Sequence, residues 1–381
     1  MFKLDENGKI ADSEPLYETL DKLHEGDDFD GVISAVLKVP EEQWSNKLRF
    51  RLVSAYNNKK DFAAAAAELE KIRPLCESPQ DLARFYYMNG YMHFMNDREM
   101  LAFSLYKLGL EADPQNTSGL DLEAECRECL DYIEEDLSEL HSASAEAVEK
   151  IRERCAENTD KAKTDEPTFA MWLGFLFSLR VLPGMKRNIG GGNIFFEFEG
   201  EEREAALKCL AENYSITSRE TMMEFIRKDR YCNLSFMVND ARASLAGTPR
   251  FDVDILNATG RQVFENTVVF VRPFADFLPK AGVLAWDINE KNGLVRYAYS
   301  CGILGREDYV AAMQALSDAA KEHFSSAEEY ITSLIFGCAV YAFDADHWNI
   351  RGAVGFVKTM LELLLNSALP DLEWKKPEKR G

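Results

Sequence analysis

Long apolar segments are missing from this chain of 381 residues. A membrane-spanning helix needs about 18 or more consecutive apolar residues, and the longest candidate, residues 169–179, ends before Arg180 and Pro183. The opening residues 1–8 are mostly charged and polar, which is unlike a signal peptide. We therefore expect a cytoplasmic protein without a membrane span, in which residues 169–179 form a buried helix.

Positive charge is also scarce in this sequence. The 44 lysines and arginines are outnumbered by 65 aspartates and glutamates, which gives a formal net charge of −21. Such a surplus of negative charge repels nucleic-acid phosphates and anionic lipids, so we expect neither nucleic acid nor a membrane as partner. The acidity is typical of a soluble protein surface. The alternative explanation for it is that the protein binds a basic partner or a cationic ligand.

Proline is infrequent, with 12 residues, while 46% of the chain is hydrophobic and 24 residues are phenylalanine. This composition provides enough apolar material for buried cores and is typical of an ordered globular protein. At roughly 100–200 residues per domain, the length predicts two or three domains. The eight cysteines are scattered along the chain, which indicates reduced thiols rather than a disulfide framework.

Complete metal-binding and nucleotide-binding motifs are absent from the sequence. Cys126 and Cys129 have the spacing of zinc ligands, but no second pair or histidine cluster completes a set of four. The three consecutive glycines within residues 183–192 follow Lys186 and Arg187 without the spacing of a P-loop or a Rossmann motif. We predict that the two cysteines are core thiols and that the protein binds no metal and no cofactor. We predict a flexible loop for the glycine-rich residues 183–192, and the alternative is that this loop binds an acidic ligand.

Residues 13–116 have the pattern of helical hairpins. The clearest unit spans residues 82–114 and resembles a tetratricopeptide repeat in the spacing of its small and aromatic positions. Successive intervals of 12, 4, 3 and 5 residues separate Gly90, Ala102, Tyr106, Gly109 and Pro114. Two weaker units precede it, and about three such units are the minimum for a stable stack, because none buries its apolar face alone.

An acidic amphipathic helix is predicted over residues 121–139, which contain nine carboxylates and one base. Apolar residues recur there at intervals of three and four, the spacing of one buried helix face. This apolar stripe consists of Leu122, Cys126, Cys129, Ile133, Leu137 and Leu140. We place a helical-repeat domain at residues 1–160, a linker at 161–167, a second helical domain at 168–370 and a basic tail at 371–381.

Several short blocks in the C-terminal half occur in a characteristic order. These blocks are residues 213–220, 281–287, 296–302, 324–330 and 333–337. With them, the chain resembles a bacterial family known as domain of unknown function 1266, over residues 168–345. Because that family has no assigned chemistry, the resemblance implies no particular activity for this protein.

The chain departs from the family pattern at charged and aromatic positions. Glu290 and Cys338 stand where the family usually has arginines, and Ala327 stands in place of a tryptophan. Tyr214 and Ser215 replace a Trp-Gly pair. If the family's charged positions form an anion site, this member lacks it in that form.

Five residues in or between the blocks 281–287 and 296–302 are candidates for a site: Trp286, Asp287, Glu290, Arg296 and Tyr297. Asp287 and Arg296 are nine residues apart, which at about 100° per residue places them about 180° apart on a straight helix. We therefore expect them not to meet, and we expect Trp286, Asp287 and Arg296 to pack between helices with buried polar pairs. The alternative is a pocket or partner surface lined by the five residues.

The sequence as a whole predicts an all-α protein, with at most one short β element at residues 190–198. The favoured function is that of an intracellular bacterial adaptor or scaffold, because stacked hairpins commonly present a concave face to a protein or peptide. The candidate surface residues there are Tyr56, Tyr87, Asn89 and Tyr91.

Two further hypotheses about function remain at this point. One is an enzyme or small-molecule binder with a pocket near Trp286, Asp287 and Arg296, which needs polar side chains that converge on a cleft. It loses its main support if Asp287 and Arg296 each bond to backbone or neighbours inside packed helices. The other is an immunity or accessory protein of a bacterial conflict system, for which the acidic charge suits a basic toxin.

Overall fold

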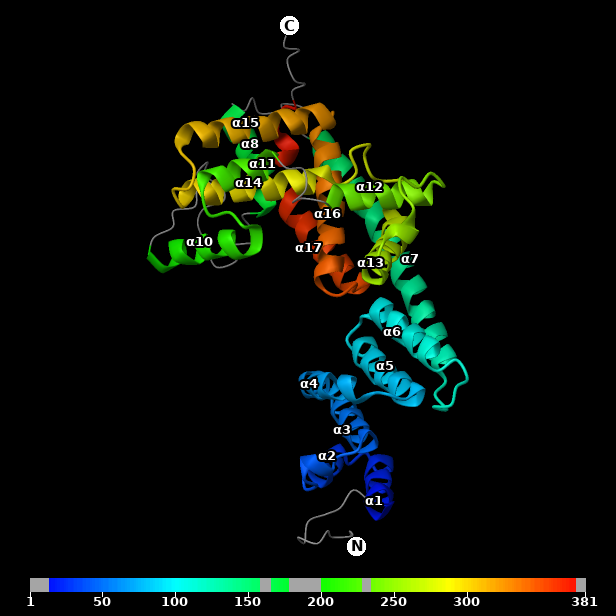
Figure 1. Ribbon diagram of the computed structural model, residues 1–381. Helices are drawn as coiled ribbons and strands as arrows, with labels where there is room; N and C mark the ends of the chain where they lie inside the picture. The colour runs from blue at the N-terminus through cyan, green and yellow to red at the C-terminus, as the bar shows by residue number, and fades with distance from the viewer. Residues whose placement is uncertain (1–13, 158–165, 178–199, 228–233, 375–381) are drawn as a thin grey trace. The chain divides into compact units, whose positions relative to one another are not determined.

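The computed structural model describes residues 14–157, 166–177, 200–227 and 234–374 (Figure 1). Every regular element within these residues is a helix, which confirms the prediction of an all-α fold. The predicted β element at residues 190–198 lies outside them, as do the glycine-rich loop and most of the predicted linker. None of the described helices combines the length and the apolar character that a membrane span requires.

The contacts divide the chain into two units. The N-terminal unit consists of residues 1–136 with 347–349, and the C-terminal unit consists of residues 137–346 and 350–381. The boundary falls inside the long helix α7 (Leu122–Glu157). Each unit has its own set of packed helices.

Three helical hairpins make up the described part of the N-terminal unit before α7. They are α1 (Glu14–Glu25) with α2 (Phe29–Val36), α3 (Asn46–Asn58) with α4 (Phe62–Ile72), and α5 (Pro79–Phe94) with α6 (Glu99–Ala112). In each hairpin a residue with positive φ lies between the helices, namely Asp27 (55°), Lys60 (60°) and Asp97 (55°). The next residue donates its N–H to the carbonyl five positions back, at 2.8, 2.9 and 3.1 Å. The three hairpins therefore share one turn geometry, a left-handed helix end of the Schellman type.

Close contact between α5 and α6 depends on a glycine. A Cβ added at Gly90 would lie 2.5 Å from the ring of Tyr106, so the ring packs directly on the α5 backbone. Tyr106 is fully buried in this position. The small residue that the repeat pattern requires at Gly90 is thus explained by the bulk of Tyr106.

The predicted apolar stripe of α7 is confirmed, since all six of its residues are buried. Cys126 and Cys129 belong to this stripe, and burial raises the pKa of both thiols, so they are core residues as predicted. Among the described residues, no group of three or more metal-ligating side chains occurs.

The C-terminal unit packs helices around α14 and α16, seen in yellow and orange in Figure 1. Besides the end of α7, the helices among its described residues are α8 (Glu166–Leu173), α10 (Gly200–Tyr214), α11 (Arg219–Arg227), α12 (Leu234–Leu245), α13 (Ala258–Val271), α14 (Leu284–Ser300), α15 (Arg306–His323), α16 (Ala327–Ala345) and α17 (Ile350–Leu365). Short 3-10 turns of this unit occur at Val253–Ile255, Arg272–Phe274 and Leu369–Asp371, and those of the N-terminal unit occur at Glu41–Gln43 and Arg73–Leu75. Most residues of α14 are buried, because α8, α12, α15 and α16 all contact it.

Candidate functional site

A stripe of polar side chains on α14 is buried rather than exposed to solvent. Asn289, Asn292 and Arg296 follow one another at intervals of three and four, the spacing of one helix face, and each has an exposed fraction of 0%. They bond to the backbone around the end of α8. Asn292 donates to the carbonyl of Ala170 at 2.6 Å, and Arg296 donates through Nη1 to that of Gly174 at 3.2 Å.

The same stripe also forms a hydrogen bond with the chain just beyond α8. The backbone N–H of Phe177 donates to Asn289 Oδ1 at 2.9 Å, and the hydroxyl of Tyr330 on α16 donates to the carbonyl of Leu173 at 2.7 Å. Helix ends leave carbonyl groups without intrahelical partners, and a buried end needs donors from elsewhere. Arg296 and its neighbours therefore satisfy backbone groups in the core.

Burial affects the charge of Arg296 only modestly. Desolvation lowers the pKa of its guanidinium to about 10, so the group stays protonated at neutral pH. A buried charge is tolerated only when polar partners surround it. Its bonds to backbone and to Asn292 mark a structural role for Arg296 in holding α8.

Two other candidates of this region are also buried among aromatic rings. Trp286 is 3% exposed, and its ring centroid lies 4.9 Å from that of Tyr341. Tyr297 contacts Phe177 edge to face at 5.6 Å, and burial raises the pKa of its phenol. The half-buried Glu290 accepts a hydrogen bond from the Asn289 amide at 3.0 Å. These residues do not converge on one cleft.

Asp287 lies on another side of α14 and bonds to α12. Its Oδ2 accepts hydrogen bonds from both the backbone N–H of Ser235, at 3.2 Å, and the Ser235 hydroxyl. The other oxygen, Oδ1, is buried and receives no hydrogen bond from the described residues. Asp287 and Arg296 thus bond to different segments, in agreement with the separation expected from their spacing.

The Asp287 carboxyl has an unusual affinity for its proton. Burial is the main cause, and it raises the pKa from 3.8 to about 7; Glu290 acts in the same direction. The two bonds from Ser235 and the charge of Lys291 oppose the rise. Near neutral pH the carboxyl is therefore present in both its protonated and its ionised form.

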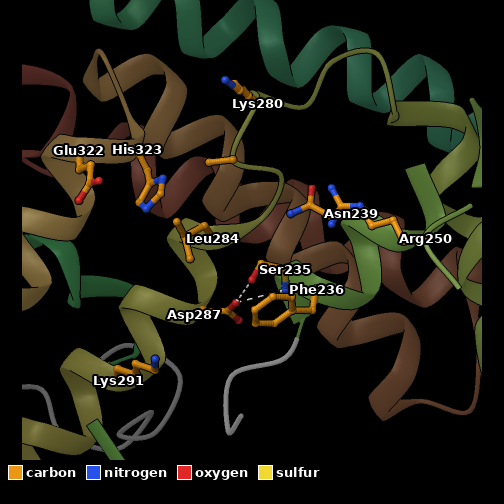
Figure 2. A pocket seen from close by; sticks show the side chains of 11 residues that line it. Ser235, Phe236, Asn239, Arg250, Lys280, Leu284, Asp287, Lys291, Glu322 and His323 are labelled. Carbon is orange, nitrogen blue, oxygen red and sulfur yellow. Dashed lines mark hydrogen bonds between the residues drawn. The ribbon is translucent and has the colours of Figure 1, made fainter. Parts of the chain in front are cut away.

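A cavity of about 560 Å³ lies beside this carboxyl, and we call it the Asp287 cavity (Figure 2). Its size falls within the range of small-molecule sites, roughly 300–1,000 Å³. Helix α12, residues 280–281, α14 and the end of α15 supply most of its lining, with Arg250 from the segment after α12. Of the five candidates, only Asp287 lines it.

The segment before α14 is fixed so that Lys280 reaches this cavity. Arg242 of α12 donates to the carbonyl of Pro279 at 3.0 Å, which ties the segment to α12. Gly282 has a φ of +63°, a left-handed conformation, and an added Cβ would collide with Asn239. Only glycine adopts this conformation without strain, and its missing side chain leaves room for Asn239. The segment can therefore cross α12 closely.

Of the other lining residues of the Asp287 cavity, only Ala281 and Leu284 belong to a block recognised in the sequence, residues 281–287. The rest come from segments far apart in the chain, and no motif connects them. The basic residues Arg250, Lys280 and Lys291 would draw attention only as positive charges in a strongly acidic chain.

The hairpin candidates occupy different places in the N-terminal unit. Asn89 lines a groove of about 380 Å³ between α4 and α5, which we call the α4–α5 groove. Tyr87 points elsewhere, since residues two apart on a helix are about 200° apart, and its ring lies 6.0 Å from Tyr106 and 6.5 Å from Tyr91. Tyr56 is partly buried against the two cores of the hairpins.

Comparison with known proteins identifies the class of this helical chain. Residues 122–376 match the family described as Protein of unknown function (DUF1266), and the chain belongs to that family. The match begins at the first residue of α7, earlier than the segment 168–345 expected from sequence. No curated protein and no solved structure matches the chain.

Proposed function

We propose that the protein is an adaptor or scaffold that acts in the bacterial cytoplasm and binds a protein or peptide through its N-terminal hairpins. The observation that supports this most is the common turn geometry of the three hairpins. The left-handed residues Asp27, Lys60 and Asp97 recur at intervals of 33 and 37 residues, close to the 34-residue period of tetratricopeptide repeats. Arrays of that kind commonly bind peptides.

The α4–α5 groove has suitable chemistry for a peptide segment. Ala66, Leu69 and Phe85 provide apolar surface, and Glu70, Arg73 and Asn89 provide polar groups. The Arg73 guanidinium lies over the Phe85 ring, 5.6 Å from its centroid, so its position is supported by a cation–π contact. An apolar side chain of a partner would bury itself in the groove while Arg73 and Asn89 bond to its backbone.

The structure removes the main support for an enzyme centred on Trp286, Asp287 and Arg296. Arg296 bonds to the backbone near α8, Asp287 bonds to Ser235, and Trp286 packs against Tyr341. Catalytic groups must meet at one cleft, and these three do not. This favours the adaptor over an enzyme with that site.

Affinity purification of the full-length protein from its native cell, with mass spectrometry of the bound proteins, tests the proposal. We expect one stoichiometric partner that is lost with the double variant Arg73→Ala/Asn89→Ala. The matched control is Lys38→Ala/Asn58→Ala, which removes the exposed side chains of a cation and an asparagine outside the groove. A partner that binds both variants equally would contradict a role for the α4–α5 groove.

A further inference from the structure

The charge of the Asp287 cavity is opposite to that of the chain. Three cationic side chains line it, Arg250, Lys280 and Lys291, against Glu322 and the buried Asp287 carboxyl. The whole chain has the reverse balance, with 44 basic and 65 acidic residues. Cations concentrated in one cavity of an acidic protein attract a negatively charged ligand.

Two of these cations are positioned in different ways. Arg250 approaches Asp240 at 3.5 Å, so part of its charge is already balanced. Lys280 makes no ion pair with any described residue, and its backbone is fixed through the bond from Arg242 to Pro279. Lys280 thus places a charge at the cavity with little cost in ordering the segment that carries it.

The cavity also has an apolar wall. The side chain of Phe236 is 53% exposed although it is a large aromatic residue, and Leu284 and Ala281 line the cavity as well. Figure 2 shows Phe236 beside Ser235 and Asp287, with Leu284 on the α14 side. Apolar surface of this kind suits the hydrocarbon part of a ligand.

The protonation of Asp287 affects the charge of the same cavity. Ser235 donates both of its hydrogen bonds to Oδ2, so the proton of the neutral carboxylic acid resides on Oδ1. In that form the group no longer repels an anion. Because Oδ1 itself is buried, Asp287 acts on a ligand in the cavity through its charge and not through a direct hydrogen bond.

We propose that the Asp287 cavity binds a small organic anion. Lys280 and Lys291 attract its carboxylate or phosphate group from different sides of the cavity, and its hydrocarbon part lies against Phe236 and Leu284 (Figure 2). This site is separate from the α4–α5 groove and does not depend on the adaptor proposal. Arg250 contributes to the attraction, and Asn239 offers an amide to further polar groups of the ligand.

Isothermal titration calorimetry on the full-length protein at constant ionic strength tests this inference. The probes are benzoate and phenyl phosphate, which share a ring and differ in the anionic group, and benzamide, which is the neutral counterpart of benzoate. We expect binding of at least one of the two anions and at least tenfold weaker binding of benzamide, because charge-assisted bonds are the strong ones. Whichever anion binds more tightly identifies the anionic group that the cavity prefers.

A pair of variants shows whether the anion occupies this cavity. Lys280→Gln/Lys291→Gln should weaken binding at least tenfold, whereas Lys208→Gln, which removes an exposed lysine of α10 outside the cavity, should leave the affinity unchanged. Circular dichroism confirms that each variant is folded. Absence of binding by both anions, equal binding of benzamide, or binding that survives the double substitution would each overturn the proposal.

Discussion

The two units of the chain hold their helices together by different means. In the hairpins, partners are close along the sequence: Gly90 packs on Tyr106, and the turn at Asp97 closes through a bond from Arg98 to His93. In the C-terminal unit, Arg296 and Asn292 of α14 each bond to a residue 122 positions earlier. One unit is built from local contacts, and the other depends on buried polar bonds across long separations.

This difference has consequences for both stability and function. Local hairpins bury apolar faces by stacking, which leaves grooves between neighbouring helices as binding surfaces. Buried polar bonds are costly when one partner is removed, because the other group keeps its desolvation penalty. We therefore expect the largest losses of stability in the C-terminal unit and smaller ones in the hairpins.

The largest effect is expected for Arg296→Ala. It should lower the free energy of unfolding by about 4–5 kcal/mol, because it leaves a cavity in the core and takes a donor from the Gly174 carbonyl. Urea unfolding followed by circular dichroism measures the loss. Arg306→Ala, at an exposed position of α15, should change the value by less than about 0.5 kcal/mol. A similar small change for Arg296→Ala would show that this buried bond does not hold α8.

The pH dependence of stability tests the environment of Asp287. Its pKa is raised to about 7 from 3.8, so the folded state binds this proton more tightly than the unfolded state does. The resulting stabilisation is fully present below about pH 4 and is lost as the pH rises to about 7, with a limit of about 4 kcal/mol for three pKa units. Asp287→Asn keeps the acceptor for Ser235 and does not ionise.

Asp287→Asn should therefore gain stability relative to the natural protein as the pH increases from 4 to 8. Urea unfolding of both proteins across this range gives the difference directly, because contributions of other ionisable groups largely cancel. A difference that is constant with pH would contradict the raised pKa of Asp287.

A smaller loss is expected for Gly90→Ala in the hairpins. The new methyl group would meet the Tyr106 ring at 2.5 Å, and overpacking of this kind costs about 2 kcal/mol. Gly355→Ala is the matched control, since this helical glycine of α17 has open space around it, and it should gain about 1 kcal/mol through helix propensity. Differential scanning calorimetry would show opposite shifts of the melting temperature. Shifts of the same sign would contradict close packing at Gly90.

The smallest effect concerns the cap at the start of α4. The Asp61 carboxylate accepts a hydrogen bond from the Ala64 N–H at 3.2 Å, and Asp61→Ala should cost about 1 kcal/mol. Asp61→Asn retains an acceptor and should lower the free energy of unfolding by only about a few tenths of a kcal/mol. If the two substitutions were equally destabilising in urea unfolding, the cap would not be the cause.

The same contrast explains how much of the fold could be predicted from the sequence. The period of the apolar residues in α7 identified a stripe that is buried throughout. The repeat spacing singled out Gly90 and Tyr106, which are in contact in the structure. Helix geometry also separated Asp287 from Arg296 before any contact was known. These features depend on distances along a single helix or hairpin.

The Asp287 cavity could not be predicted in the same way. Ser235, Lys280 and Asp287 come together only because α12, the segment at Gly282 and α14 cross at particular angles. The pairing of Arg296 with Gly174 likewise depends on where α8 ends. No periodic pattern encodes such crossings. The sequence therefore predicted buried polar pairs for Arg296 and Asp287, but it did not predict that Arg296 bonds to the backbone near α8 while Asp287 lines a cavity.

The central claim is that the two units carry independent binding sites, and a crossed binding experiment tests it most directly. Partner capture and benzoate or phenyl phosphate binding are measured for the full-length variants Arg73→Ala/Asn89→Ala and Lys280→Gln/Lys291→Gln. We predict that the first variant loses the partner and retains the anion, and that the second shows the opposite result. Loss of both activities in one folded variant, or loss of the same activity in both, would contradict this account.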